Sequence, residues 1–564
     1  MRRLWACLSL IAALLASAPV RADEARPRVT IRQGVLQGVQ AQGVAAYKGI
    51  PYARPPVGPL RWRSPVRAAA WTGDRDASAF GNACLQPPQS PTGLYSGGMA
   101  PMSEDCLSLN VWTPARAQGR GGKLPVMVWI HGGALVGGSG SEPLYDGAKL
   151  ASQGIVLVSI NYRLGLLGYF AHPALSAESP QHLSGNYGLL DQIEALRWVR
   201  DNIGAFGGDP GQVTIAGESA GGLSVIALLA SPQAKGLFQK AIVQSGYMPA
   251  YRALHNETLG LSSAEAGGAA LGAAAGANTA EQLRAANLVA LFMAGVATGW
   301  QPEPVIDGVV LPRQLVDAFA RGEQAKAPIL AGVNEGEIRS LPFLMPPAPA
   351  TSAAYVADVK RRFGDKAEAY LTVYPGAEPK ADVMASIRDG VYGFAAQYLV
   401  RQQAGAGQPA YLYYFRHGTP AQAARDLTAF HASELPYVFG QVGEGAQLGP
   451  NWPRPPLIAE ETALSDAMMA YWVSFVRTGA PTAPGETAWP RFTARERGYL
   501  DIDRRPLAAR DLHPAAFDWA DALVAERRAR GRAWRLDIGF SAFPAPPADG
   551  RVDAQDAKRQ PEGP

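Results

Sequence analysis

Apolar residues gather in six short runs along the chain, with helical patterns between them. The runs cover residues 125–130, 155–160, 213–216, 241–244, 327–333 and 410–415. Several are continuously apolar, which is typical of strands covered on both faces of a mostly parallel sheet. Residues 189–203 repeat apolar positions at helical spacing. This alternation of strand and helix predicts an α/β fold with one open sheet flanked by helices.

Two long segments, about 247–326 and 351–404, interrupt this alternation. Residues 263–276 are rich in alanine and glycine, and we interpret them as an ordinary helix. Because both segments are too long for loops, we expect helical insertions that form the active-site wall. We expect one catalytic domain over residues 23–543. The tail at 544–564 is rich in proline and charge, so we expect it to be disordered.

The first 22 residues have the pattern of a secretory signal peptide. Arg2 and Arg3 precede an apolar stretch, residues 4–16, that is too short to span a bilayer. Small residues at 20–22 favour cleavage after Ala22, and an N-terminal membrane anchor is the alternative. No other segment is apolar for long enough to span a membrane. We therefore expect an exported protein, periplasmic or secreted, without stable membrane insertion.

Charge and cysteine content refine this picture. The formal net charge is +4, and residues 1–22 carry three arginines and no acidic residue, so the remaining chain carries +1. A near-neutral chain gives no electrostatic case for a nucleic-acid partner. Cys7 would leave with the signal peptide, and Cys84 and Cys106 would remain. A cysteine pair in an exported protein indicates a disulfide.

The most informative motif is Gly217-Glu218-Ser219-Ala220-Gly221, which lies between the apolar run 213–216 and a helical segment at 222–230. Strand, sharp turn and helix together predict a nucleophile elbow that exposes Ser219. The flanking glycines are needed because a Cβ there would clash with the adjoining strand and helix. Ser219 is therefore the candidate nucleophile of a serine hydrolase.

Such an enzyme also needs backbone donors for an oxyanion. Gly132 and Gly133 follow the apolar run 125–130, and their lack of side chains lets backbone N–H groups approach a developing negative charge. Together with the N–H of Ala220, they form the predicted oxyanion hole. His131 is expected to pack and form hydrogen bonds rather than to catalyse.

The general base and the acid that orients it are less clear from the pattern. In hydrolases with this elbow the order along the chain is serine, acid, histidine. The histidines after Ser219 are His255, His417, His431 and His513. We favour His431 over His417, because its longer loop can place an imidazole over the elbow. The acid candidates are Glu335 and Glu337, which follow the run 327–333, with Asp307 as a third.

The chain resembles the type B carboxylesterases, the group that contains cholinesterases and bacterial para-nitrobenzyl esterases. The resemblance extends from about residue 31 to 500. It rests on YKGIPYARPPVG at 47–58, EDCLSLNV at 104–111, FGGDP at 206–210 and AIVQSG at 241–246. Chance alone does not place so many ordered blocks at suitable separations. The resemblance implies an α/β-hydrolase fold.

The same resemblance also selects the partners of Ser219. Residues 431–440 match the block that carries the general base, which selects His431, and residues 332–337 match the block that carries the acid, which selects Glu337. Many relatives have an aspartate before that glutamate and a glycine after it, where this chain has Gly336 and Ile338. Cys84 and Cys106 stand where relatives form a disulfide. By similarity, Glu218 and Ser245 belong to a buried polar network behind the triad.

The predicted activity is hydrolysis of a small-molecule carboxylic ester through an acyl-enzyme, without a metal or other cofactor. An amidase or a lipase on the same triad, and a catalytically silent binding module, are the alternatives. The sequence does not determine the natural ester or the oligomeric state.

Overall fold

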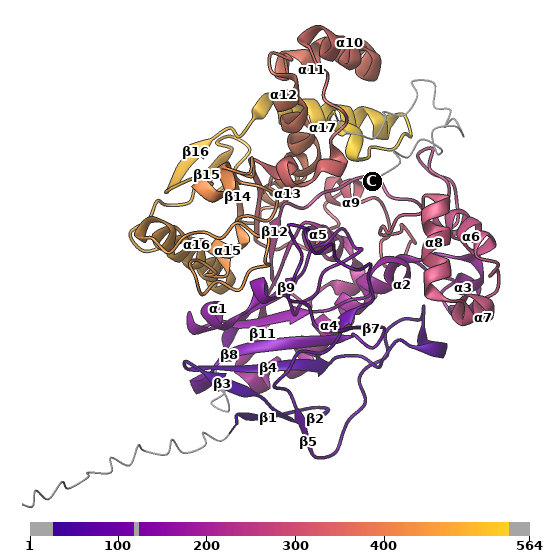
Figure 1. Ribbon diagram of the computed structural model, residues 1–564, viewed down its shortest axis with the longest axis vertical. Helices are drawn as coiled ribbons and strands as arrows, with labels where there is room; N and C mark the ends of the chain where they lie inside the picture. Colours follow the sequence, from indigo (N-terminus) through magenta and orange to yellow (C-terminus); the bar gives the residue numbers. More distant parts are fainter. Residues whose placement is uncertain (1–25, 118–122, 541–564) are drawn as a thin grey trace, which may run out of the picture.

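A computed structural model describes residues 26–117 and 123–540, and a mixed sheet of 11 strands forms the centre of this part of the chain (Figure 1). The central strands, from β10 to β15 in the spatial order, are parallel, and antiparallel strands lie at both edges. The order across the sheet is β16 (Pro506–Arg510), β15 (Gly498–Ile502), β14 (Ala410–Phe415), β13 (Ile329–Asn334), β12 (Lys240–Gln244), β11 (Gly208–Glu218), β9 (Leu124–Ile130), β10 (Val156–Ile160), β8 (Ser108–Pro114), β4 (Val44–Pro51) and β3 (Val39–Ala41).

All six predicted strands are present, and they are neighbours in the parallel part of the sheet. They correspond to β9 to β14, with ends that differ from the predicted ones by a few residues. The edge strands β3, β4, β8, β15 and β16 had no strand signal in the sequence. These strands mix polar with apolar residues, as in SLNVWTP of β8, so their hydrophobic pattern is weaker.

Helices cover both faces of the sheet and create two hydrophobic cores. In β9, Val126, Val128 and Ile130 face one core, whereas Met127 and Trp129 face the other. The first core also contains residues of α4 (Tyr187–Asn202), α5 (Ala220–Ala230) and α13 (Phe394–Gly405). The second contains residues of α1 (Ala148–Ser152) and α16 (Ala459–Thr478). Burial on both faces explains why the central strands are continuously apolar.

The two interrupting segments are helical. The first contains α6 (Ala264–Ala274), α7 (Ala280–Ala285), α8 (Leu288–Thr298) and α9 (Leu315–Ala320), and the second contains α10 (Ser352–Phe363), α11 (Ala367–Val373), α12 (Pro379–Arg388) and α13. Helices α6 to α8 pack with α3 (Pro173–Glu178) on one side of the molecule. Helices α10 to α12 lie near α17 (Pro514–Ala529) at the top of Figure 1, toward the side of the sheet that carries β14 to β16.

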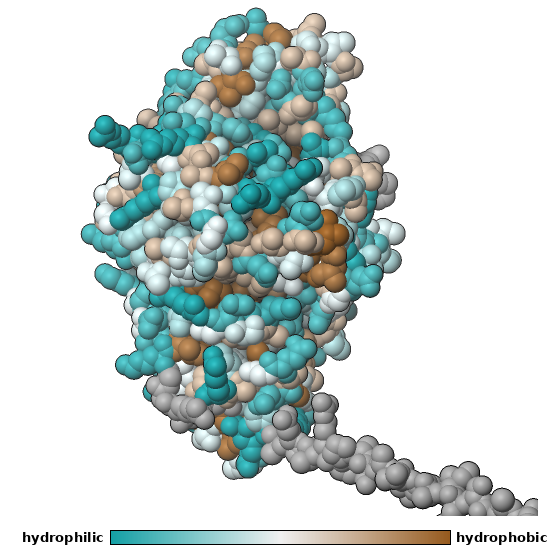
Figure 2. All heavy atoms as spheres, turned by 90° about the vertical axis from the view of Figure 1, so that its left-hand side faces the viewer, coloured by the Kyte–Doolittle hydropathy of each residue, from teal (hydrophilic) through white to brown (hydrophobic). Residues whose placement is uncertain are grey.

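Polar side chains dominate the face that carries α16 and β16, and apolar groups form only small patches there (Figure 2). Across residues 26–117 and 123–540, no helix combines the length and the apolar composition needed to cross a membrane. The predicted signal peptide, residues 1–22, and the predicted disordered tail, residues 544–564, lie outside the described residues.

Candidate active site

Ser219 occupies the sharp turn between β11 and α5. Its backbone has φ 57° and ψ −120°, a strained conformation for a residue with a side chain. A Cβ on Gly221 would lie 2.0 Å from the carbonyl oxygen of Ile130, and one on Gly217 would lie 2.5 Å from the Gly221 carbonyl group. The predicted elbow is therefore present, and both glycines are sterically required. This strained turn places Ser219 in the lining of the pocket.

Gly132 and Gly133 follow β9 and lie against the elbow. A Cβ on Gly132 would lie 3.2 Å from the Cβ of Ser219, and Gly133 has φ 102°, which favours glycine. Among the described residues, neither N–H donates to a backbone carbonyl. Ala220 opens α5, where the first N–H groups of a helix lack intrahelical partners. These three N–H groups are thus available near Ser219.

His431 lies in the loop between α14 (Pro420–Ala423) and α15 (Leu435–Val438), and its Nδ1 contacts Oε2 of Glu337. Glu337 lies three residues after the end of β13 and is fully buried. Its Oε1 accepts hydrogen bonds from the Ser245 hydroxyl at 2.6 Å and from the Asn334 N–H at 2.8 Å. Several donors thus hold this carboxylate in place beside the imidazole.

Backbone contacts join the loop that carries Glu337 to the loop that carries His431. The Gly336 N–H donates to the carbonyl of Ala429 at 2.9 Å, two residues before His431. A Cβ on Gly336 would lie 2.0 Å from the carbonyl oxygen of Thr428. Gly336, which departs from the pattern of many relatives, therefore permits close packing of the loop after β13 against the loop that carries His431.

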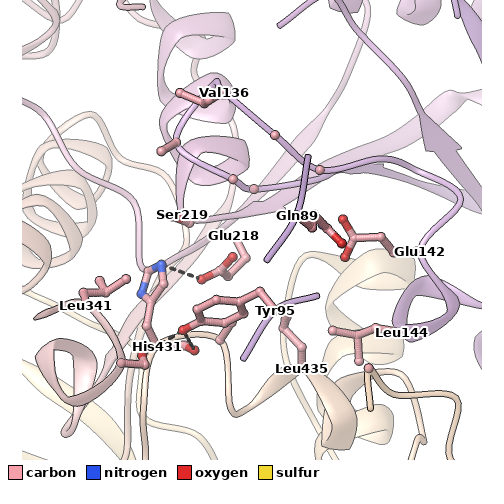
Figure 3. Close-up of a pocket in the computed structure, with 18 of the residues that line it drawn as sticks. Gln89, Tyr95, Val136, Glu142, Leu144, Glu218, Ser219, Leu341, His431 and Leu435 are labelled. Carbon is pink, nitrogen blue, oxygen red and sulfur yellow. Dashed lines mark hydrogen bonds and ion pairs between the residues drawn. The ribbon is translucent and has the colours of Figure 1, made fainter. Parts of the chain in front are cut away.

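The other ring nitrogen of His431 faces Glu218. Nε2 lies 3.1 Å from Oε1 of Glu218 (Figure 3), although the direction of this contact is not that of a hydrogen bond. The hydrogen bonds of the described residues include none between the Ser219 hydroxyl and His431. Such catalytic hydrogen bonds often form only with substrate present. The imidazole therefore lies between two carboxylates.

These carboxylates control the protonation of the site. Burial disfavours the charged imidazole, but Glu218 and Glu337 outweigh it and raise the pKa of His431 to about 9. Burial also raises the pKa of Glu218 to about 8, against the opposing effect of His431. The two groups titrate as a coupled pair.

The remaining candidates lie elsewhere. Glu335 is exposed, and Asp307 accepts hydrogen bonds from a turn at 309–311 and from Asn186. His417 lies 3.1 Å from both oxygens of Glu461. His131 bonds to the Gly132 carbonyl and stacks on Tyr162, and burial lowers its pKa to about 4. Of the candidate bases and acids, only His431 and Glu337 lie together near Ser219 in the described part of the chain.

A pocket of about 540 Å³ opens at Ser219. Its walls come from residues 86–97, from the loop after β9, from 340–344 and from 431–452. Of the two helical insertions, the first contributes Tyr247 and the second contributes Val391 and Tyr392. The insertions therefore supply a smaller part of the wall than we expected, because helices α6 to α8 pack away from the pocket.

Several residues that border or support this site had little or no signal in the sequence. Glu434 is buried, and it accepts hydrogen bonds from the side chains of Asn334 at 2.6 Å and Gln244 at 2.8 Å. The Tyr95 hydroxyl donates to the carbonyl of His431 at 2.9 Å. Glu434 lies in the block that begins with His431, and this position was the only available signal. Tyr95 is distant in sequence and had none.

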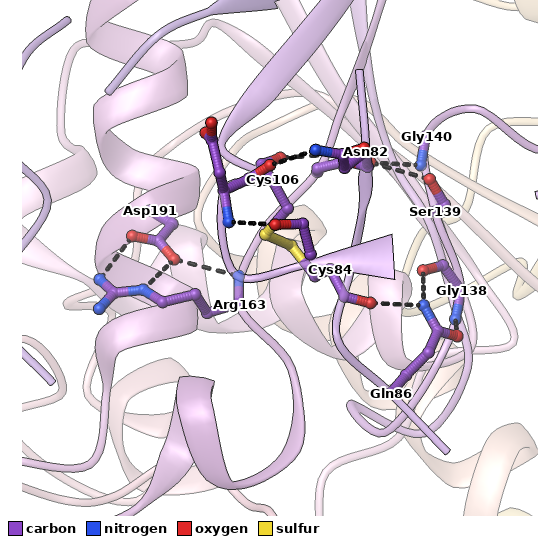
Figure 4. Close-up of a disulfide and its surroundings, with 12 residues drawn as sticks. Asn82, Cys84, Gln86, Cys106, Gly138, Ser139, Gly140, Arg163 and Asp191 are labelled. Atoms are coloured by element: carbon purple, nitrogen blue, oxygen red, sulfur yellow. Dashed lines mark hydrogen bonds and ion pairs between the residues drawn. A yellow bond between two sulfur atoms is a disulfide. The ribbon is translucent and has the colours of Figure 1, made fainter. Parts of the chain in front are cut away.

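Cys84 and Cys106 form the predicted disulfide, which closes a loop with a sequence separation of 22 (Figure 4). Gln86, two residues after Cys84, forms hydrogen bonds with the loop that carries Gly132 and Gly133. Its Nε2 donates to the carbonyl of Gly138 at 3.0 Å, and the Gly138 N–H donates to its Oε1 at 2.8 Å. The disulfide segment is thus attached to the backbone beside Gly132 and Gly133.

Comparisons with known proteins show the family of this chain. The model of the carboxylesterase family matches residues 25–518. The chain is 39% identical to the fumonisin B1 esterase of Sphingopyxis macrogoltabida, over 85% of this chain and 87% of that protein. It is 37% identical to the para-nitrobenzyl esterase of Bacillus subtilis (strain 168), over 84% of this chain and 94% of that protein.

Solved structures give the same result. A PNB esterase structure has a TM-score of 0.73 and 33% identity, and the match covers 90% of this chain and 99% of that chain. A carboxylesterase of Geobacillus stearothermophilus, Est55, has a TM-score of 0.72 and 33% identity, with 90% of this chain and 100% of that chain covered. The predicted family resemblance is confirmed, and so is the predicted α/β-hydrolase fold.

Proposed function

Since the chain belongs to the carboxylesterase family and hydrolyses carboxylic esters, we propose that it does so through an acyl-enzyme on Ser219. Ser219 Oγ attacks the ester carbonyl carbon, and His431 takes the hydroxyl proton. The C–O bond to the alcohol then breaks, and His431 gives the proton to the leaving oxygen. Water repeats the two steps on the acyl-enzyme and releases the acid.

Glu337 holds the imidazole of His431 through Nδ1 and stabilises its cationic form during each transfer. Ser245 and Asn334 keep this carboxylate oriented. The N–H groups of Gly132, Gly133 and Ala220 donate to the oxyanion of each tetrahedral intermediate. Glu218 belongs to the supporting network. No metal or other cofactor takes part in these steps.

The observation that carries this proposal is the contact of the buried Glu337 with His431, whose side chain lines the same pocket as the strained Ser219. A para-nitrophenyl ester tests the mechanism under pre-steady-state conditions. We expect a burst of para-nitrophenol close to one equivalent per chain whenever deacylation is slower than acylation. Ser219→Ala should give neither burst nor turnover while its thermal unfolding curve stays unchanged. A burst in that variant would contradict the proposal.

We also infer that the substrate is a small-molecule ester met outside the cytoplasm. The Cys84–Cys106 disulfide supports export, because disulfides persist in oxidising compartments. The basic and then apolar pattern of residues 1–22 supports export as well. N-terminal sequencing of the protein from a periplasmic or culture fraction tests this inference. A mature chain that begins at Asp23 is expected, and an uncleaved cytoplasmic chain would contradict it.

A further inference from the structure

The backbone is strained on both sides of His431, the proposed base. Ala429 has φ 46° and Ala432 has φ 70°, in the left-handed region that residues with a side chain rarely adopt. Such strain persists only where surrounding contacts hold the backbone in place. The orientation of His431 therefore depends on what fixes the peptide groups of its loop.

Hydrogen bonds from β13 and the loop after it fix the peptide groups before His431. The carbonyl of Ala429 accepts the Gly336 N–H at 2.9 Å. The carbonyl of Phe430 accepts the side-chain amide of Asn334 at 3.0 Å. Both bonds lie on the N-terminal side of the imidazole, so they do not restrain the peptide group that follows it.

Tyr95 holds the peptide group between His431 and Ala432. Its hydroxyl donates to the His431 carbonyl at 2.9 Å (Figure 3). Within residues 26–117 and 123–540, this carbonyl accepts no other hydrogen bond. The same peptide group leads directly into the strained Ala432. The Tyr95 hydroxyl therefore restrains the backbone on the C-terminal side of the imidazole.

The same hydroxyl also reaches the segment that carries Glu337. Its oxygen lies 2.7 Å from Oγ of Ser340, the last residue of the short helix η6 (Glu337–Ser340). A tyrosine hydroxyl has one proton and a carbonyl can only accept, so that proton goes to His431, and the Ser340 hydroxyl donates to Tyr95. One hydroxyl thus connects the backbone of His431 to the helix of Glu337.

The position of Tyr95 is fixed without its hydroxyl. Its ring packs edge-on against Trp452, with centroids 5.7 Å apart, and lies 6.5 Å from the ring of Phe430. The side chain of Asn451 donates to the carbonyl of Gly93 at 3.0 Å, two residues before Tyr95. A phenylalanine at this position would keep these contacts and lose only the hydroxyl.

Resting on the proposed esterase function, we propose that Tyr95 is a positioning residue that keeps His431 aligned with Glu337 by holding the His431 carbonyl. Tyr95 acts through the backbone of the base rather than on the reacting atoms. Without the hydroxyl, the peptide group before Ala432 rotates more freely, and the imidazole spends less time against Glu337. Fewer chains are then ready for proton transfer.

Tyr95→Phe tests this role with a para-nitrophenyl ester. We expect kcat to fall about tenfold, the effect of one lost hydrogen bond on the aligned state, and KM to change little. Tyr355→Phe is the matched control, because the Tyr355 hydroxyl also donates to a backbone carbonyl, that of Tyr374 at 3.1 Å. Tyr355 lies on α10 and does not line the pocket, so this variant should keep the wild-type kcat.

The pH profile of kcat/KM distinguishes positioning from a general loss of structure. The titratable side chains around His431 are Tyr95, Glu218, Glu337, Tyr392 and Glu434. Contact with the Glu337 carboxylate raises the pKa of His431, so a less aligned imidazole has a lower pKa. The ascending limb should therefore move to lower pH in Tyr95→Phe and stay in place in Tyr355→Phe.

A double-mutant cycle tests whether Tyr95 acts through the pair of Glu337 and His431. In Glu337→Gln, where the alignment is already lost, Tyr95→Phe should change kcat/KM by about twofold or less. An equal loss in both backgrounds, an unchanged kcat, a change in KM alone or an unmoved pH limb would overturn the positioning role while the esterase function stands.

Two further variants complete the test. Turnover that persists in Ser219→Ala would overturn the proposed function itself, and the role of Tyr95 with it. If Tyr95→Phe does not fold, Ser340→Ala decides, because it removes the other hydroxyl of the same bridge. We expect its kcat to fall about threefold. An unchanged kcat in Ser340→Ala would then overturn the proposal.

Discussion

Gln86 links the disulfide segment to the oxyanion loop, and we expect its loss to slow catalysis. Val136 and Gly137 N–H groups both donate to the carbonyl of Gly133 at 2.9 Å, so residues 133–138 form one tight turn. A Cβ on Gly138 would lie 2.6 Å from the Gly132 carbonyl oxygen, which shows how closely the two ends pack. A displacement of Gly138 would therefore move Gly132 and Gly133, the proposed oxyanion donors.

The magnitude follows from the hydrogen bonds that Gln86→Leu removes. Two of them join Gln86 to Gly138, at 3.0 and 2.8 Å. At about 1 kcal/mol each, they stabilise the position of the loop by about 2 kcal/mol. If all of this energy holds the loop in its catalytic position, kcat falls by about 30-fold. Loss of a complete oxyanion donor costs about 100- to 1,000-fold, so a partial effect is reasonable.

Steady-state kinetics with a para-nitrophenyl ester measures this effect. We expect kcat to fall and KM to change little, because the oxyanion forms only after substrate binds. The affinity for a boronic acid that mimics the tetrahedral intermediate should fall in parallel. Gln86→Glu keeps the acceptor for the Gly138 N–H and loses the donor, so its loss should be intermediate. A folded Gln86→Leu variant with normal kcat, or with a change in KM alone, would refute the reasoning.

Glu337→Gln should lower kcat/KM by about 10,000-fold, as expected for an orienting acid, whereas the exposed Glu335→Gln should stay close to wild type; equal losses would refute the acid assignment. Glu218→Gln should move the ascending limb of the kcat/KM pH profile to lower pH, because the Glu218 carboxylate raises the pKa of His431 and only the neutral imidazole accepts a proton. An unchanged or raised limb would contradict this. Reduction of the Cys84–Cys106 disulfide should lower the free energy of unfolding in urea by about 3 kcal/mol, and an unchanged midpoint would count against that value.

The parallel centre of the fold was predictable because each of its strands is buried on both faces. Such burial produces continuous apolar runs, as in β9 and β13, that a single sequence displays. The elbow was predictable for a related reason, since its glycines are local steric requirements around Ser219. The edge strands were missed because they mix polar with apolar residues and so lack a continuous apolar run.

The catalytic partners depended on long-range placement. Periodicity left His417 with His431, and Glu335 with Glu337, because all four follow strands of the same sheet. The family resemblance resolved both pairs, and the contact between Glu337 and His431 agrees with that choice. The position of Glu218 against Nε2, and the attachment of Gln86 to Gly138, depend on side-chain packing across loops. No local pattern in the sequence encodes such packing.

Mapping the acyl group tests the central claim most directly. The protein would be mixed with a para-nitrophenyl ester, quenched in acid, digested and examined by mass spectrometry. One acyl group per chain on Ser219 is the predicted result, with none in a Ser219→Ala variant that unfolds at the wild-type temperature. An acyl group on another residue, or full turnover by Ser219→Ala, would contradict the account.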